Sequence, residues 1–133
     1  MAEIRVKPDE TAQQLREHVR ANPALVKDEY RHPDDPIQGA CYMLAEAYFH
    51  ARGGPESDLK VFRLGWDEVY DDAAGAHWFL RDGPDGPVID LSLPEPSDGE
   101  DIPWSLARGR AFITGWTPSN RTQRVLDALD ISY

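Results

Sequence analysis

Residues 39–52, GACYMLAEAYFHAR, decide the fold of this chain. Apolar side chains occur on nearly every side of a helix drawn through this stretch, which is typical of a helix buried on all faces. Gly53, Gly54 and Pro55 follow directly, and these residue types commonly end helices. Because no comparable stretch occurs elsewhere in the chain, we expect this helix to lie at the centre of the core.

Further helices are expected on both sides of the central one. Before it, the pattern predicts a helix capped by Asp9 or Thr11 and ending near Ala21, and then a short helix over residues 23–30. After it, residues 117–129 predict a last helix with one apolar side. We therefore expect helices that flank the centre at both ends of the chain.

The pattern between and beyond these helices indicates strands. Residues 82–86 contain two aspartate–glycine steps, which are typical of the tight turn in a hairpin. The expected strands cover residues 4–6, 60–64, 76–81, 87–91 and 111–114. The sequence thus predicts an α+β fold, in which the buried central helix packs on an antiparallel sheet of three to five strands.

Length and charge narrow the class of protein. The chain has 133 residues, enough for one domain over 1–133, with a helical lead over 1–37, a core over 38–92 and a loop, strand and helix over 93–133. Its net charge of −10 disfavours binding to nucleic acid or to an anionic membrane surface. No apolar run is long enough for a membrane span, and residues 1–5 have no apolar signal core. We expect a cytoplasmic protein.

A cysteine stands in the first turn of the central helix. Cys41 is the single cysteine of the chain, which excludes an intramolecular disulfide and any multi-cysteine zinc site. The partial positive charge at a helix N-terminus stabilises a thiolate, the form that a cysteine nucleophile needs. Taken alone, a free cysteine is more often a core residue than a nucleophile.

A histidine and an aspartate lie on the two strands of the expected hairpin. His77 is near the start of one strand, where it could take the thiol proton and later protonate a leaving group. Asp90 ends the next strand, where a carboxylate could hold the imidazole and stabilise its charged form. Taken alone, the histidine could simply pack beside an aromatic ring and the aspartate could accept hydrogen bonds in a turn. Together with Cys41, in this order, the two residues form a candidate catalytic triad.

This order of residues and elements resembles the core of transglutaminase-like cysteine proteins, within the broader papain-like group. The resemblance implies that Cys41 is the nucleophile, His77 the base and Asp90 the residue that orients the base. This sequence departs from the family pattern at two positions. No residue separates His77 from Trp78, where the family often has one, and Leu91 follows the aspartate where the family usually has a proline. The similar stretches are 39–41 at the start of the central helix, 61–64, 76–79 and 88–90.

Two further residues are candidates for substrate contacts. An acyl-transfer site needs donors to a developing oxyanion, and the backbone N–H of Cys41 and the side chain of Gln38 could serve. Trp78 could line an acyl pocket or simply pack in the core. We expect no cofactor and no metal, because the chain has neither a phosphate-binding glycine motif nor metal ligands at short spacing.

Arginines gather late in the chain. Such a cluster could recognise an anionic group, but pairing with the excess of acidic residues is the role we expect. These residues are Arg108, Arg110, Arg121 and Arg124.

Two functions from different classes remain open. The first is a small cysteine-dependent acyl-transfer enzyme, protease-like or transglutaminase-like, acting on a peptide, a protein or a small amide or ester. The alternative is a non-catalytic acidic binding or accessory protein, of the kind that viruses and mobile elements encode, which keeps the fold and contacts a protein partner through an exposed loop over residues 92–104. An open cleft beside Cys41 would favour the enzyme, and a fully packed Cys41 the binding protein.

Overall fold

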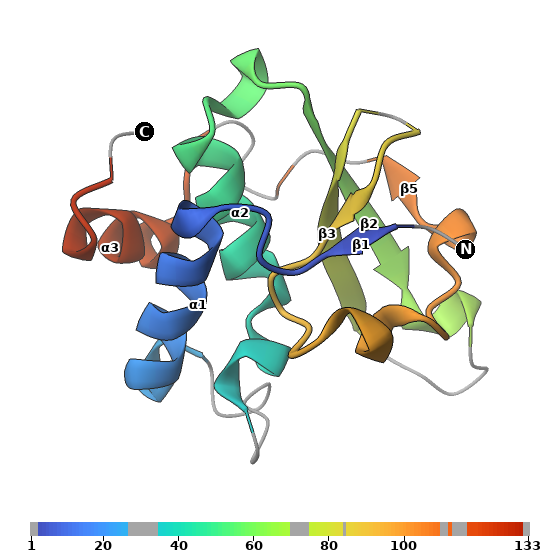
Figure 1. The fold of residues 1–133 in the computed structure, drawn as a ribbon, viewed down its shortest axis with the longest axis horizontal. Coiled ribbons are helices and arrows are strands. Elements are labelled where there is room, and N and C mark those ends of the chain that lie inside the picture. The colour runs from blue at the N-terminus through green and yellow to red at the C-terminus, as the bar shows by residue number, and fades with distance from the viewer. Residues whose placement is uncertain are drawn as a thin grey trace.

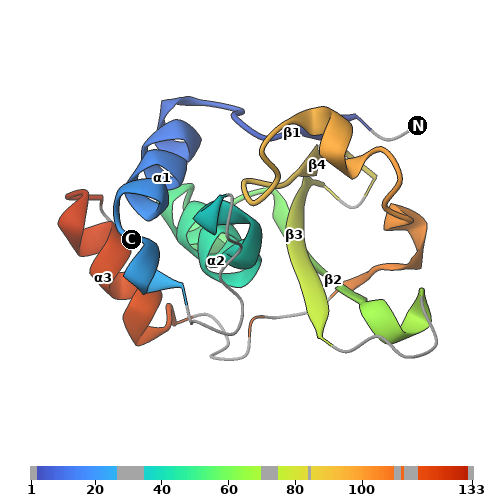
Figure 2. The ribbon, with the colours of Figure 1, turned by 90° about the horizontal axis from the view of Figure 1, so that it is seen from below.

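The helix α2, Cys41–Ala51, is the central element of the structure, a computed structural model that describes residues 3–26, 35–69, 75–83, 85–109, 112 and 117–131. It lies between the sheet on one side and the helices α1, Glu10–Ala21, and α3, Asn120–Ala128, on the other (Figures 1 and 2). Residues 43–50 are all buried. The expected central helix is therefore confirmed.

Five strands form one sheet in the order β1-β4-β3-β2-β5. β2, Leu59–Gly65, and β3, Ala76–Asp82, pair antiparallel over their full lengths. β4, Val88–Ile89, pairs antiparallel with β3 and completes the expected hairpin. The edges are β1, Ile4–Arg5, and β5, Arg108–Gly109, of which β5 pairs antiparallel with β2.

The α+β class is confirmed, with one difference in strand direction. β1 runs parallel to β4, with Ile4 opposite Val88, so the sheet is mixed rather than antiparallel throughout. β1 and β4 are far apart in the sequence, and no tight turn between them imposes an antiparallel pairing. The pairing matters for the site, because the carbonyl of Arg5 accepts a 3.0 Å hydrogen bond from the backbone N–H of Asp90.

Both faces of the sheet are covered. Leu80 and Ile89 belong to the core that α1, α2 and α3 share, whereas Phe79 belongs to a second cluster with Leu93 and Trp104. The segment between β4 and β5 supplies the cover of this second face (Figure 2). The expectation of an exposed contact loop over residues 92–104 is wrong for these two side chains, since Leu93 is only 8% exposed and Trp104 only 7%.

The flanking elements agree with the sequence in part. Of the two expected caps of α1, the structure uses Asp9, whose side chain accepts a hydrogen bond from the Ala12 N–H, and not Thr11, which lies within the helix. The expected helix over 23–30 is a 3₁₀ turn at Pro23–Leu25, and most of the remainder lies outside the described residues. Of the strand expected over 111–114 only Phe112 is described, and it is buried outside any strand.

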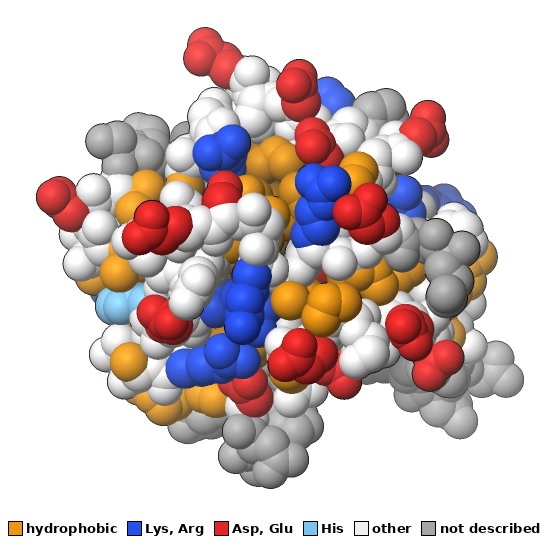
Figure 3. Space-filling view, viewed as in Figure 1, with side chains coloured by type: hydrophobic (Ala, Val, Ile, Leu, Met, Phe, Trp, Pro, Cys, Tyr) orange, Lys and Arg blue, Asp and Glu red, His pale blue; other side chains and the backbone are white. Residues whose placement is uncertain are grey.

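The surface is charged and mixed. Acidic and basic side chains lie side by side on the face shown in Figure 3, with small apolar areas between them. Within the described ranges, none of the helices has the length and apolar character that crossing a membrane requires.

Candidate functional site

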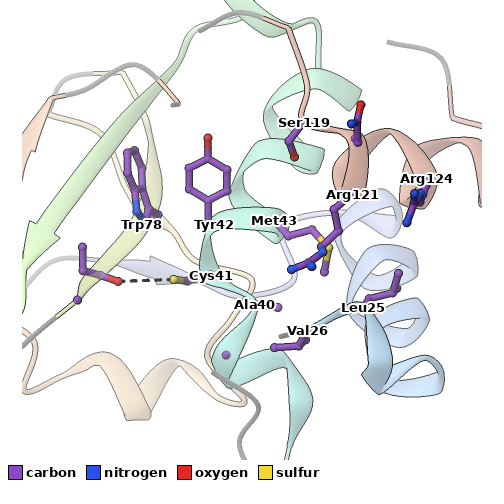
Figure 4. A pocket seen from close by; sticks show the side chains of 14 residues that line it. Leu25, Val26, Ala40, Cys41, Tyr42, Met43, Trp78, Ser119, Arg121 and Arg124 are labelled. Atoms are coloured by element: carbon purple, nitrogen blue, oxygen red, sulfur yellow. Dashed lines mark hydrogen bonds between the residues drawn. The ribbon is translucent and has the colours of Figure 1, made fainter. Parts of the chain in front are cut away.

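Cys41 is the first residue of α2 and is partly exposed. Its thiol donates a long hydrogen bond, 3.9 Å from sulfur to oxygen, to the carbonyl of Ala76 at the start of β3 (Figure 4). The first backbone bond of the helix runs from the Leu44 N–H to the Ala40 carbonyl, and Ala40 has no side chain that could cap the helix. Among the described residues the backbone N–H of Cys41 has no acceptor, so it can donate to a bound oxyanion.

His77 lies in β3, one residue after Ala76, and is 8% exposed. Its Nε2 forms a very short hydrogen bond with a carboxylate oxygen of Asp90, and its ring also interacts electrostatically with the Cys41 side chain, whose sulfur lies against the carbonyl of the neighbouring Ala76. Burial disfavours the charged imidazolium, but the charge and hydrogen bond of Asp90 and the interaction with Cys41 outweigh it and raise the pKa of His77 to about 10. At neutral pH His77 is therefore charged.

Asp90 follows β4 directly and is 2% exposed. One of its oxygens is bonded to His77, and the other accepts hydrogen bonds from the backbone N–H of Ser92 at 3.0 Å and from the Ser92 hydroxyl at 2.6 Å. Burial would raise the pKa of Asp90, but the charge of His77 and these hydrogen bonds lower it below its usual range. The buried carboxylate is therefore ionised and fully paired.

Sequence reasoning missed three side chains around the histidine. Ser92 orients Asp90, and the spacing of a serine two residues after an aspartate is a known turn pattern that could have indicated it. The rings of Trp66 and Trp104 pack beside the His77 ring, with centroids 5.7 and 5.8 Å away. No local pattern could have indicated the two tryptophans, because they come from separate segments.

A cavity of about 570 Å³ opens beside Cys41. Leu25, Val26 and Met43 give it an apolar wall, and Tyr42 and Trp78 a second wall in which the two rings meet edge to face at 4.9 Å. Residues 119–121 and Arg124 of the α3 region line the remaining side (Figure 4). This volume is in the range of small-molecule sites.

The predicted residues relate to this cavity in different ways. Cys41 and Trp78 line it, whereas His77 and Asp90 are not part of the lining and are bonded to each other. A tenth of the His77 side chain is nevertheless exposed. Gln38 lies in a 3₁₀ turn, Pro36–Gly39, with an exposed side chain that is not part of the lining, so the structure does not bring it to the other four.

The two other histidines in the described part of the chain are not part of this arrangement. His50 is at the other end of α2, where burial lowers its pKa, and His18 lies on α1 beside Asn22. Among the described residues, no group of three or more histidine, cysteine or acidic side chains is placed to hold a metal ion.

Comparisons of the chain with protein-family models, with curated proteins and with solved structures found no match. The resemblance to transglutaminase-like proteins accordingly stays a prediction from the residues themselves.

Proposed function

We propose that the chain is a small cysteine-dependent acyl-transfer enzyme, with Cys41 as nucleophile, His77 as acid and base, and Asp90 as the residue that positions His77. The observation that carries the proposal is that the single thiol of the chain lines a cavity and bonds to the carbonyl of Ala76, next to a histidine that is paired with a buried carboxylate and interacts electrostatically with the thiol. A transglutaminase-like core with the same order of residues is consistent with it. We place this activity in the cytoplasm.

The proposed chemistry starts from the charged pair of His77 and Asp90 next to Cys41. With His77 protonated, the Cys41 sulfur attacks the carbonyl carbon of an amide or ester as a thiolate, and the Cys41 N–H donates to the oxyanion. The bond between carbon and nitrogen or oxygen then breaks, and the His77 proton goes to the leaving amine or alcohol. Water or an amine attacks the thioester, His77 takes its proton, and the Cys41 thiolate leaves.

The alternative of a non-catalytic binding protein has less support. A binding protein of this kind is expected to have a fully packed Cys41, whereas Cys41 is partly exposed and lines a cavity. The proposed partner-binding loop is also less available than expected, because Trp104 is buried.

The single cysteine permits a direct test of the proposed function. The intact protein is incubated with p-nitrophenyl acetate at pH 7, and the burst of nitrophenolate and the mass of the protein are measured. We expect one acetyl group per chain, on Cys41, formed at least tenfold faster than on free cysteine, and none in Cys41→Ala. An acetylation rate no higher than that of free cysteine would contradict the proposal and favour the binding protein.

A second histidine gives the matched control. His77→Gln should remove the rate enhancement while leaving Cys41 in place, whereas His18→Gln, on α1, should retain it. Circular dichroism of both variants checks that each is folded. Equal loss in the two folded variants would overturn the role of His77.

A further inference from the structure

Two arginines on α3 border the cavity that Cys41 lines. Arg121 and Arg124 are both part of its lining, and Arg121 extends from α3 towards Met43 and Ala40 (Figure 4). They are three residues apart on a helix, so their side chains share one face. The cavity thus has the candidate nucleophile in its lining together with two guanidinium groups.

These two arginines have no carboxylate partner within the described part of the chain. Four other arginines there do form ion pairs: Arg5, Arg20, Arg52 and Arg108. The chain has 24 acidic residues against 14 lysines and arginines, so partners are abundant. The expectation that the late arginines pair with acids is therefore confirmed for Arg108 and wrong for Arg121 and Arg124, while Arg110 lies outside the described residues.

The placement of the pair is also unfavourable for α3 itself. Two like charges three residues apart on a helix repel by about 0.2–0.5 kcal/mol. Arg121 lies in the first turn, where a positive charge opposes the helix dipole. The negative charge that this helix end favours comes instead from Glu46 of α2, which accepts hydrogen bonds from Ser119 and Thr122. An anion between the two guanidinium groups would offset both costs.

We infer that the cavity binds a small amide or ester with an anionic end, a carboxylate or a phosphate, which Arg121 and Arg124 hold while the reacting carbonyl lies at Cys41. The apolar stem of such a substrate would contact Leu25, Val26 and Met43. Guanidinium groups bind both anions through paired hydrogen bonds. This inference rests on the proposed function, because it identifies the class of substrate for the same site.

The test compares thiol reagents that differ in charge. Methyl methanethiosulfonate is neutral, and its sulfonatoethyl analogue is anionic; both form a disulfide with the Cys41 thiolate and release methanesulfinate. For wild-type protein and for Arg121→Gln/Arg124→Gln, the ratio of the anionic to the neutral rate is measured at fixed ionic strength. We expect the ratio to fall about tenfold in the double variant, while the neutral rate stays within about twofold.

A charge-matched control separates the effect of the two cavity arginines from the effect of the net charge of the protein. Arg5→Gln/Arg108→Gln also removes two positive charges, from exposed side chains that do not line the cavity. Its ratio should stay close to that of wild type. An equal fall in both double variants, or no fall in either, overturns the inference.

Failure of this inference is distinguishable from failure of the proposed function. Fast acetylation of Cys41 together with an unchanged rate ratio would leave the enzyme proposal intact and remove the anionic substrate. Where the ratio falls as expected, acetate and inorganic phosphate are added as competitors, and the one that slows the anionic reagent more identifies the anion.

Discussion

At the scale of single residues, the unusual feature is a histidine with a buried carboxylate on one ring nitrogen and a thiol bonded to the carbonyl of the residue before it. Asp90 uses Nε2 of His77, which leaves Nδ1 as the nitrogen available to Cys41. Ser92 binds the other oxygen of Asp90, so the carboxylate cannot turn without losing hydrogen bonds. The orientation of the imidazole thus depends on two residues that never meet the cavity.

Replacing the carboxylate tests this dependence. Asp90→Asn preserves the shape of the side chain but removes the charge that stabilises protonated His77, so we expect the acetylation rate of Cys41 to fall by about 100-fold or more. Ser92→Ala removes one hydrogen bond to Asp90 and should lower the acetylation rate of Cys41 about tenfold. Stopped-flow measurement of nitrophenolate release gives both rates. A rate in Asp90→Asn equal to that of wild type would show that the carboxylate has a structural role only.

At the scale of elements, a buried glutamate connects the central helix to α3. Glu46 is completely buried, and one of its oxygens accepts hydrogen bonds from the Ser119 N–H at 3.1 Å, the Ser119 hydroxyl at 2.7 Å and the Thr122 hydroxyl at 2.5 Å. The contact places the start of α3 against α2, and with it Arg121. The position of the two arginines at the cavity therefore depends on a residue of the central helix.

Removing this glutamate should weaken the whole fold. Glu46→Ala leaves the buried hydroxyl of Thr122 and the half-buried hydroxyl of Ser119 without this acceptor and opens a small cavity, so we expect the free energy of unfolding to fall by about 3 kcal/mol. Thr122→Val keeps the shape of the side chain but removes one donor to Glu46, and it should lower the free energy of unfolding by about 1 kcal/mol. Urea unfolding followed by tryptophan fluorescence measures both. Glu17→Ala, on the exposed side of α1, is the control and should change stability by less than 0.5 kcal/mol, by the usual size of surface effects.

At the scale of the whole molecule, the His77–Asp90 pair links stability to pH. The pKa of His77 is about 10 in the folded chain and near its ordinary value of 6.5 when unfolded, so the pair contributes its full stabilisation below about pH 6.5. That contribution decreases as the pH rises and is lost above about pH 10. Asp90 acts in the opposite range: its lowered pKa adds stability above pH 3.8, and this stability is lost as the pH falls below that value.

Unfolding measured across this range tests the linkage. We expect the free energy of unfolding of the wild-type chain to decrease steadily between pH 6.5 and pH 10. The double variant His77→Gln/Asp90→Asn keeps a polar pair without titrating groups and should lose most of this slope. Parallel slopes in the two proteins would mean that His77 and Asp90 do not interact as a charged pair in the folded state.

Local pattern and spacing alone determined the central helix, the hairpin of β3 and β4, and the order of Cys41, His77 and Asp90. These features depend on residues that are close in sequence, because the spacing of apolar residues and the identity of turn residues directly indicate local helices, strands and turns. The tertiary structure alone decided the parallel pairing of β1 with β4, the burial of Trp104 and the convergence of Arg121 and Arg124 on the cavity beside Cys41. Each of these joins segments that are distant in the chain, and such contacts follow from how whole elements pack, which no local period encodes.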